Sequence, residues 1–421
     1  MNTRNAILRP LALKNTTQNY AWGSHTAIQQ LMGKAPTDVP WAELWIGAHP
    51  KAPSMVDING QWVGLDTLIQ QFSDEILGKT TAARFDNTLP FLFKILAADR
   101  PLSIQAHPDQ MQAKTGFARE NTLGMPMDDP SRNYRDPFHK PECICALTPF
   151  TALKGFRDMD DIMGLLGQLI PESINRLTRQ TTTAATAPSA SGAQKPETCL
   201  SPSPIKQLYQ SLLDLTSDVK NSLLAEAVEN AKKAPAANEV FSWVLRLHHE
   251  YPDDIGILSP ALMHLATLVP GQALFLEAGE LHAYLHGMGI EIMANSDNVL
   301  RGGLTAKHMD TAELLRVGRF DPEPPHILTP DPMSALEFRY PVRAEEFVLS
   351  IIHMVNGASY PASENRSVEI LLCTEGTARL THPGLHEAIL LTPGESVLIP
   401  AAADPYRLEG AARVYKAAVP I

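Results

Sequence analysis

Two polar side chains with metal-binding chemistry stand two residues apart in the stretch LSIQAHPD, residues 102–109. The stretch begins as a strand, and side chains at this spacing on a strand point to the same face. Gln105 and His107 therefore present an amide and an imidazole side by side, directly after the apolar run FLFKIL at 91–96. A strand that only filled a core would carry another aliphatic residue here, so we interpret the pair as half of a metal site.

Two further residues of metal-ligand type lie at the ends of expected strands. Glu142 stands in HKPECIC, before a short apolar strand, and His282 ends the strand ALFLEAGELH. The mouth of a β-barrel gathers residues from distant parts of a chain. Two imidazoles and a carboxylate suit Zn²⁺, and the carbonyl oxygen of Gln105 would be a fourth ligand. A catalytic ion would also need one position open to substrate.

Each of these ligands, taken alone, also fits an ordinary structural role, and neighbouring residues offer competing sites. His282 and His286 have the i,i+4 spacing that pairs two ligands on a helix. The flanking glycines and the strand pattern argue against a helix there, so we leave His286 out. Cys143 and Cys145 are interpreted as small residues packed in a strand rather than as thiolate ligands.

The stretch EIMANSDNVLRGGLTAKH, residues 291–308, is crowded with polar groups. Arg301 precedes Gly302-Gly303, which would let the backbone turn closely around a ligand. An arginine offers planar paired donors to a phosphate, or a fixed charge to an oxyanion. Lys140 and Lys307 add positive charge, so we expect a pocket for a small anion in an otherwise acidic protein.

The elements that must position these residues are mostly strands. Residues 1–155 are dense in short strand and turn signals, with helical spacing at 25–33 and 65–78, and strand signals resume at 270–285 and from 327 onward. Between them, 158–179 and 205–250 read as helices, around a Thr-, Ala-, Ser- and Pro-rich stretch at 181–204 that we expect to be a flexible loop. The chain is thus expected to be mainly β, with a helical insertion of about a hundred residues.

Composition sets the outer bounds on function. With 421 residues, two or three domains are expected. A net charge of −11 argues against a non-specific nucleic-acid binder. The four cysteines form no CxxC pair, the N-terminus lacks a secretory pattern, and no apolar run reaches the ~20 residues that span a bilayer. We expect a cytoplasmic protein that does not bind membranes.

A short internal echo links the two β regions. PGQALFLEAGELH at 270–282 and PGESVLIPAAADP at 393–405 align without gaps, each with a Pro-Gly turn before an apolar strand. The second copy has Pro405 where the first has His282, and proline cannot ligate a metal. If the echo reflects two copies of one β module, only the first carries this ligand.

With these residues in view, the chain resembles the type I phosphomannose isomerases. The matching stretches follow the family's order over the first three hundred residues, while the C-terminal third matches in apolar pattern only. They are QNYAWGS (18–24), AELWIGAHP (42–50), LPFLFKIL (89–96), LSIQAHPD (102–109), HKPE (139–142), FTALKGFR (150–157), and LHAYL through NSDNVLRGGLTAKH (281–308).

The resemblance implies an architecture of two cupin-type jelly rolls plus an α-helical insertion. On it we expect a discontinuous zinc cupin domain at 1–154 and 256–326. The helical insertion would be 155–255, with its flexible loop at 181–204. A metal-free cupin domain would follow at 327–421.

The resemblance also implies one zinc ion per subunit, held by Gln105, His107, Glu142 and His282, with mannose 6-phosphate and fructose 6-phosphate as substrates. The segment after the arginine departs from the family's usual Ala-Gly-Leu-Thr-Pro-Lys, with glycine at 302 and alanine at 306. We predict catalytic roles for Arg301, Glu291, Lys140 and Asp297, and substrate contacts for Trp22, Ser103, His139, Tyr284 and Lys307.

The expected reaction moves a proton between C2 and C1 of an aldose–ketose pair through an enediolate. Glu291, Asp297, His139 and Lys140 are candidates for the general base, and the sequence leaves Glu291 and Lys140 open. Two other functions remain open: an iron-dependent cupin dioxygenase, disfavoured by the glutamine ligand, and a non-catalytic sugar-phosphate-binding cupin. The expected partner is a small-molecule sugar phosphate, and a monomer is expected.

Overall fold

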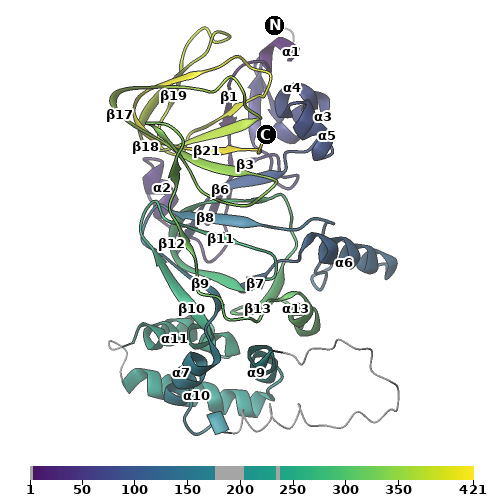
Figure 1. The fold of residues 1–421 in the computed structure, drawn as a ribbon, viewed down its shortest axis with the longest axis vertical. Coiled ribbons are helices and arrows are strands. Elements are labelled where there is room, and N and C mark those ends of the chain that lie inside the picture. Colours follow the sequence, from purple (N-terminus) through teal and green to yellow (C-terminus); the bar gives the residue numbers. More distant parts are fainter. Residues whose placement is uncertain (1–2, 176–202, 234–237) are drawn as a thin grey trace.

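The structure is a computed structural model that describes residues 3–175, 203–233 and 238–421. It is mainly β, as expected, with two large sheets stacked along the long axis and a layer of helices at one end (Figure 1). The expected flexible loop at 181–204 lies outside the described residues, apart from Ser203 and Pro204. No described helix has the length and apolar character needed to cross a membrane.

The first sheet carries the predicted ligands. It has eleven strands, and its main path runs in the order β14-β11-β8-β12-β6-β3-β2. Its strands are β2 (Thr16–Gln18), β3 (Glu43–Gly47), β6 (Phe91–Ala98), β7 (Ile104–Ala106), β8 (Glu142–Ala146), β9 (Phe150–Phe156), β10 (Met263–Leu268), β11 (Ala273–Leu276), β12 (His282–Ala294), β13 (Leu300–Gly303) and β14 (Ile327–Leu328).

Strand β12 organises this sheet because it is paired along its whole length. Its first half, from His282, pairs with β9 and β7, and its second half pairs with β8 and β6. Gly287 joins the halves with φ +120, and a Cβ there would stand 2.6 Å from the carbonyl oxygen of Pro149. Residues of β12 that pair with β7 and β9, and residues that pair with β6 and β8, therefore face the same interior.

The second sheet has ten strands, and three of them come from the N-terminal region. Leu11 of β1 pairs with Leu398 of β20, and β1 also pairs with β4, which pairs with β5. Its strands are β1 (Leu11–Lys14), β4 (Met55–Ile58), β5 (Gln61–Gly64), β15 (Asp331–Pro332), β16 (Glu337–Arg339), β17 (Val348–Pro361), β18 (Glu369–Thr381), β19 (Ile389–Leu391), β20 (Ser396–Ile399) and β21 (Arg407–Ala418).

The sheets thus cross the expected division of the chain, because β1, β4 and β5 fall within 1–154 yet lie in the sheet formed mainly by 327–421. The domain boundaries otherwise stay a prediction. The largest core cluster joins Phe91, Phe93 and Ile95 of β6 to Ile370 and Tyr415 of the second sheet. Since side chains alternate along a strand, Leu92, Lys94 and Leu96 face the other way, into the first sheet's interior.

The two echoed segments fold alike. Strands β11 and β20 each span four residues and begin three residues after the proline of their turn. The intervening glycines, Gly271 and Gly394, have φ values of +90 and +88, a region that L side chains rarely adopt. The aligned sequences therefore reflect the same turn-and-strand geometry.

The helical layer lies below the first sheet in Figure 1, where its helices pack on one apolar cluster with β7, β9 and β13. It confirms the expected helical segments on either side of the undescribed stretch. Its elements are α7 (Met159–Leu169), α9 (Pro204–Leu213), α10 (Ser217–Lys233), α11 (Glu239–Glu250), η1 (Ile255–Leu258) and α12 (Ser259–Leu262).

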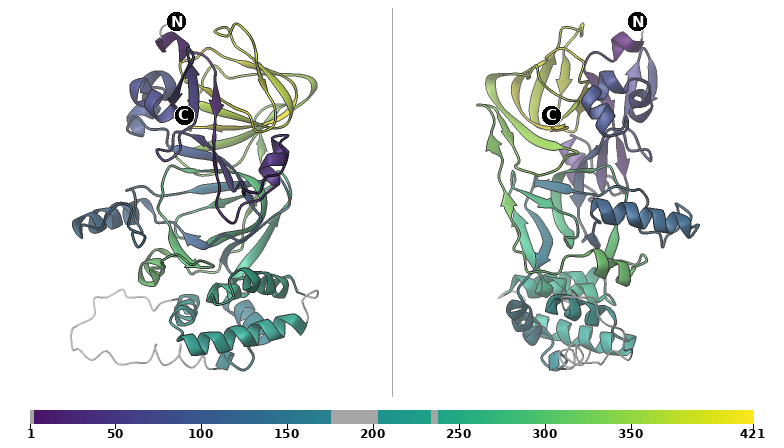
Figure 2. Two further views of the ribbon diagram at one scale, coloured as in Figure 1. Left: turned by 180° about the vertical axis from the view of Figure 1, so that it is seen from behind. Right: turned by 45° about the vertical axis from the view of Figure 1, so that its right-hand side comes forward.

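The remaining helices divide into expected and unexpected ones. Those expected at 25–33 and 65–78 are confirmed as α2 (Ala27–Leu31), α3 (Leu65–Gln71) and α4 (Ser73–Leu77). Helices α1 (Thr3–Ala6), α5 (Lys79–Arg84), α6 (Gln110–Thr122) and α13 (Thr311–Val317) were not predicted. Figure 2 shows from two sides that α6, which follows β7 in the chain, projects away from the β body.

Candidate metal centre and its cavity

The register of three neighbouring strands aligns three predicted site residues. Gln105 of β7 lies directly opposite His282 of β12 on one side and opposite Arg301 of β13 on the other. Residues directly opposite in antiparallel strands share a face of the sheet. The order Arg301, Gln105, His282 therefore places a cation next to two of the predicted metal ligands.

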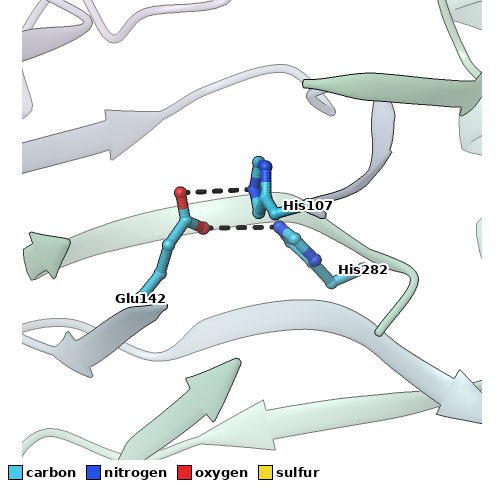
Figure 3. A group of neighbouring side chains, drawn as sticks. All are labelled: His107, Glu142 and His282. Atoms are coloured by element: carbon cyan, nitrogen blue, oxygen red, sulfur yellow. Dashed lines mark ion pairs between the residues drawn. The ribbon is translucent and has the colours of Figure 1, made fainter. Parts of the chain in front are cut away.

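Three of the predicted ligands meet in space, as Figure 3 shows. The Nε2 atom of His107 is 3.3 Å from one carboxylate oxygen of Glu142, and the Nε2 atom of His282 is 3.4 Å from the other. The three ligand atoms lie within 4.8 Å of one another, and all three residues are buried. Ligand atoms around a tetrahedral zinc ion lie roughly 3.3–3.6 Å apart, as its bond lengths require. The spacing fits such an ion.

Backbone hydrogen bonds fix which nitrogen of each imidazole faces the centre. The Nδ1 atom of His107 is 2.7 Å from the carbonyl oxygen of Asn298, and that of His282 is 3.0 Å from the carbonyl oxygen of Glu280. Each Nδ1 therefore donates, which leaves the Nε2 lone pair for a metal. The Nε2 atom of His107 is buried and has no hydrogen-bond partner in the described structure.

Gln105, the fourth predicted ligand, lies directly opposite His282 on the neighbouring strand. Its Nε2 atom donates to the hydroxyl of Ser103 over 3.2 Å. This contact uses the amide nitrogen, so the carbonyl oxygen is the atom that remains for a cation. The chain then passes His107 and enters α6, whose first turn is closed by reciprocal hydrogen bonds between Asp109 and Gln112.

The electrostatics of Glu142 and His107 favour the protonation states that bind metal. Burial opposes ionisation of Glu142, but nearby Lys140, 3.1 Å away, and His107 hold its pKa well below the usual range. Burial lowers the pKa of His107 to about 4. At neutral pH the centre therefore offers a carboxylate and a neutral imidazole, which are the forms that coordinate divalent cations.

Asn298 supports the centre and was not among the predicted site residues. Its side chain is fully buried, donating to the carbonyl oxygens of Asp136 and Phe138 over 2.8 Å and accepting from the amide of Arg135 over 2.7 Å. Since its own carbonyl holds His107, Asn298 ties that ligand to the segment leading to Glu142. In the sequence, the run of polar residues NSDN at 295–298 was the feature that could have indicated this role for Asn298.

A cavity of about 570 Å³ opens beside the metal centre. Most predicted site residues line it, whereas His107 lies behind the surface and His139 is not among the lining residues. The predicted residues in its wall are Trp22, Ser103, Gln105, Lys140, Glu142, His282, Tyr284, Glu291, Asp297, Arg301 and Lys307. His139 instead places its Nε2 atom 2.6 Å from a carboxylate oxygen of Glu346, which is why it turns away from the cavity.

One wall of the cavity holds a buried charge cluster that sequence reasoning missed. The ammonium of Lys94 lies 2.8 Å from Glu291 and 3.4 Å from Glu43, and all three are buried. Burial opposes the charge on Lys94, but these two carboxylates raise its pKa above the usual value. Burial, together with nearby Glu142, raises the pKa of Glu291. In the sequence, the position of Lys94 inside the apolar run FLFKIL was the feature that could have indicated this cluster.

Asp297 sits at a different wall and is held by two basic residues. Its carboxylate lies 2.8 Å from Lys51 and 3.6 Å from His49. Burial would raise its pKa, but these hydrogen-bonded partners lower it far below the usual value. Asp297 therefore stays ionised and paired, a poor state for a proton acceptor at neutral pH.

One end of the cavity, at Arg301 and Lys307, is cationic. Burial and nearby Arg135 lower the pKa of Arg301, and burial together with Arg301 and Arg135 lowers the pKa of Lys307. No carboxylate in the described part of the chain forms an ion pair with Arg301 or Lys307. Cations that depress one another's pKa without a carboxylate partner form a site for a small anion.

Two of the aromatic side chains that line the cavity, Trp22 and Tyr284, were predicted site residues. Trp22 is partly buried and stacks on Tyr20 with ring centroids 5.7 Å apart. Tyr284 is buried, its hydroxyl has no hydrogen-bond partner in the described structure, and burial raises its pKa well above the usual range. An unsatisfied hydroxyl in a cavity wall is available to a polar ligand.

The alternatives that the sequence set aside are also resolved. Residues His282–Ala294 form one strand, so His286 does not share a helical face with His282, and its side chain is exposed. Cys143 and Cys145 are fully buried in β8 and are free thiols, as expected for small residues packed in a strand. Neither cysteine belongs to the metal centre.

The two β-sheet bodies and this donor set define a cupin-type protein with a candidate divalent-metal centre. The family described as phosphomannose isomerase type I, catalytic domain, matches residues 11–159, and the mannose-6-phosphate isomerase cupin domain matches residues 337–418. A mannose-6-phosphate isomerase of Salmonella typhimurium is 40% identical over 405 residues, covering 96% of this chain and 97% of that one. The chain therefore belongs to the type I phosphomannose isomerase family and is an enzyme of that isomerase class.

Other relatives agree over the full length. The mannose-6-phosphate isomerase of Escherichia coli is 40% identical over 411 residues, covering 96% of this chain and 98% of that protein. A crystal structure of the Salmonella typhimurium enzyme bound to its substrate, fructose 6-phosphate, and zinc superposes with a TM-score of 0.85 at 37% identity. That comparison covers 98% of this chain and all of the other.

Proposed function

We propose that this chain interconverts mannose 6-phosphate and fructose 6-phosphate with one zinc ion, through an enediolate intermediate. The observation that carries the proposal is the cavity itself, in which Glu142 and His282 of the His-Glu-His triad line one side, and the cations Arg301 and Lys307, without carboxylate partners in the described structure, line another. A sugar phosphate has complementary ends, a carbonyl that needs polarising and a phosphate that needs positive charge. The substrate-bound Salmonella typhimurium structure supports this choice of ligand.

Four residues would hold the zinc ion: Gln105, His107, Glu142 and His282. A bound zinc ion would supply a Lewis acid that polarises the substrate carbonyl. The chain contributes the geometry, because backbone carbonyls hold both imidazoles with their Nε2 atoms toward Glu142. Lys140, 3.1 Å from Glu142, keeps that carboxylate ionised.

The proton must leave C2 of the aldose and reach C1 on the same face of the sugar. We assign this transfer to Glu291, because burial raises its pKa toward the range in which a carboxylate exchanges protons efficiently. Lys94, 2.8 Å away, keeps a fraction of it ionised and ready to accept the proton. Asp297 is the weaker candidate because Lys51 and His49 lower its pKa, and Lys140 is committed to Glu142.

The negative charge that develops on the enediolate needs a fixed cation. Arg301 is assigned this role because it stands next to Gln105 across the strand pair. Removing such a group typically costs ~10²–10³ in rate. Lys307 would bind the phosphate. Trp22, Ser103 and Tyr284 would contact the sugar from the cavity wall.

A coupled assay that reports fructose 6-phosphate from mannose 6-phosphate tests the proposal directly. The purified protein is assayed as isolated, after chelation, and after zinc is added back. We expect activity to disappear with the metal and return with zinc, and His282→Ala to lose metal and turnover together. Full turnover by His282→Ala, or turnover unaffected by removing bound metal, would contradict the assignment.

A further inference from the structure

Residues 301–307, which we call the cationic segment, carry Arg301 and Lys307 and have an unusual backbone conformation. This conformation determines where the cationic end of the cavity lies. The segment begins at Arg301, which lies opposite Gln105 on the neighbouring strand, and then leaves the strand. Gly303 has φ +145, and Leu304, a non-glycine residue, has φ +54. A leucine in the left-handed region is unfavourable by itself and persists only where its surroundings hold it.

The surroundings that hold it come from the helical layer. The hydroxyl of Tyr209 in α9 donates to the carbonyl oxygen of Gly302 over 2.8 Å, and this contact is buried. Asp254, which precedes η1, accepts from the amide of Thr305 over 3.0 Å. The same carboxylate accepts from Gly256 over 2.7 Å, which closes its own turn. Two side chains of the helical layer thus bind the main chain between Arg301 and Lys307.

Packing around Gly302 leaves no room for a side chain. A Cβ at this position would stand 2.6 Å from the hydroxyl oxygen of Tyr209, a distance that real Cβ atoms do not show, while its next neighbours would be 3.2 and 3.3 Å away. At position 302 the family usually has alanine, whereas this chain has glycine. The hydroxyl of Tyr209 occupies the space that the alanine methyl group would need. The ring of Tyr209 is itself fixed by Phe156 and Phe320, each with centroids 5.6 Å away.

We propose that the helical layer sets the geometry of the cationic segment through the hydrogen bond from Tyr209 to Gly302, so that Tyr209 is a positioning residue for sugar-phosphate turnover. The inference rests on the proposed function, because it gives the cations of that segment their substrate. It assigns the helical layer a part in catalysis although Tyr209 does not line the cavity. The metal ligands lie outside the segment and should be unaffected.

The first test compares Tyr209→Phe with a matched control, Tyr340→Phe. Tyr340 is equally buried and its hydroxyl also donates to a glycine carbonyl, that of Gly271, over 2.8 Å. Gly271 lies in the turn before β11, away from the cavity. We expect kcat/KM of Tyr209→Phe to fall about 5- to 10-fold, the scale of leaving one buried carbonyl without its donor. Zinc content should equal that of the wild type.

The control should lose thermal stability as well but keep kcat/KM within about twofold of the wild type at a temperature well below unfolding. Wild-type activity is measured first, because its absence would refute the proposed function rather than this inference. If the wild type is active and Tyr209→Phe retains its kcat/KM, the inference is wrong. An equal fall in Tyr340→Phe would also overturn it, since the loss would then report general destabilisation.

A double-mutant cycle tests the contact itself. Gly302→Ala should reduce kcat/KM in the wild-type background because the new methyl group meets the Tyr209 hydroxyl. In the Tyr209→Phe background that hydroxyl is gone, so the same alanine should cost several-fold less. Effects that simply multiply would show that the two groups do not touch. If Tyr209→Phe does not fold, Gly302→Ala alone perturbs the contact from the other side, with zinc content and kcat/KM again as readouts.

Discussion

Replacing Lys94 by methionine should leave two buried carboxylates in the cavity wall with no cation beside them. Methionine keeps most of the side-chain length and removes only the charge. Lys94 lies 2.8 Å from Glu291 and 3.4 Å from Glu43, and no other cation forms an ion pair with either carboxylate in the described structure. Burial already raises the pKa of Glu291, and in the variant nothing close by would oppose that effect.

The distance sets the scale of the effect on activity. A unit charge pair 2.8 Å apart interacts by roughly 6 kcal/mol at an effective dielectric constant of 20. If relaxation and water entry leave about half of this, Glu291 favours its protonated form by ~3 kcal/mol more than in the wild type, which corresponds to about 100-fold. We therefore expect kcat/KM at pH 7 to fall about 100-fold. Only the deprotonated carboxylate accepts a proton, so activity should recover as pH rises.

Stability should fall at the same time, because removing one partner of a buried ion pair costs about 3–5 kcal/mol. The matched control is Lys416→Met. Lys416 is buried to the same extent in the second sheet, 2.6 Å from Glu337 and 3.6 Å from Glu369, and does not line the cavity. It should lose comparable stability without any change in the pH dependence of kcat/KM.

The assay is the pH profile of kcat/KM for the wild type and both variants, with zinc content measured on the same samples. The reasoning predicts that the acid limb moves to higher pH in Lys94→Met alone. An unchanged acid limb with near-normal kcat/KM at pH 7 would show that Glu291 does not supply the base. The same displacement in Lys416→Met would attribute it to lost stability instead.

Three further predictions concern the metal centre and the cationic end. Arg301→Ala should lower kcat about 10²–10³-fold while zinc content stays at the wild-type level, as metal analysis and steady-state kinetics would show. Asn298→Ala should weaken zinc affinity about 10- to 100-fold and alter the visible spectrum of the cobalt-substituted protein, whereas Asn133→Ala, at a buried asparagine bonded to Asp310, should change neither. Metal-free protein should lose stability as pH falls from about 6.5 to about 4, measured by thermal unfolding. The reason is that burial depresses the pKa of His107 in the folded state and the unfolded chain then takes up the proton more readily.

The sequence predicted His107, Glu142 and His282, which meet in the structure, because these residues carry local signals. His107 follows a strand pattern two residues after Gln105, and Glu142 and His282 stand at strand ends, where barrel residues converge. His282 was expected to end the strand ALFLEAGELH, but that strand stops at Leu276 and His282 begins β12 instead. These are the places where polar side chains contradict the apolar pattern around them. The helical layer was equally visible, since its helices repeat apolar residues at helical spacing.

Other features depended on pairings that one sequence does not reveal. Lys94 was hidden inside an apolar run, because alternation on β6 is visible only once both faces are known to be buried. The partners of Asp297 come from a distant loop, at Lys51 and His49. Helix α6 carries little apolar periodicity, and its start depends on the Asp109 capping box instead. His139 was expected in the cavity but pairs with Glu346, which lies 207 residues further along the chain.

The charged side chains around the cavity form three separate groups, and each group has a different balance of charge. One wall of the cavity places Lys94 between two buried carboxylates, so that its positive charge offsets one of the two negative charges there. The metal centre places one carboxylate between two imidazoles. In the described part of the chain no carboxylate forms an ion pair with Arg301 or Lys307, so a bound anion would relieve the repulsion between these cations. Because Arg301 lies opposite Gln105 on the neighbouring strand, an anion bound at this end would lie beside the metal centre, in the cavity that Glu291 also lines. In the proposal for Tyr209, the helical layer holds residues 301–307 in place. A small shift of that backbone would misalign a substrate bound there relative to the metal centre and Glu291.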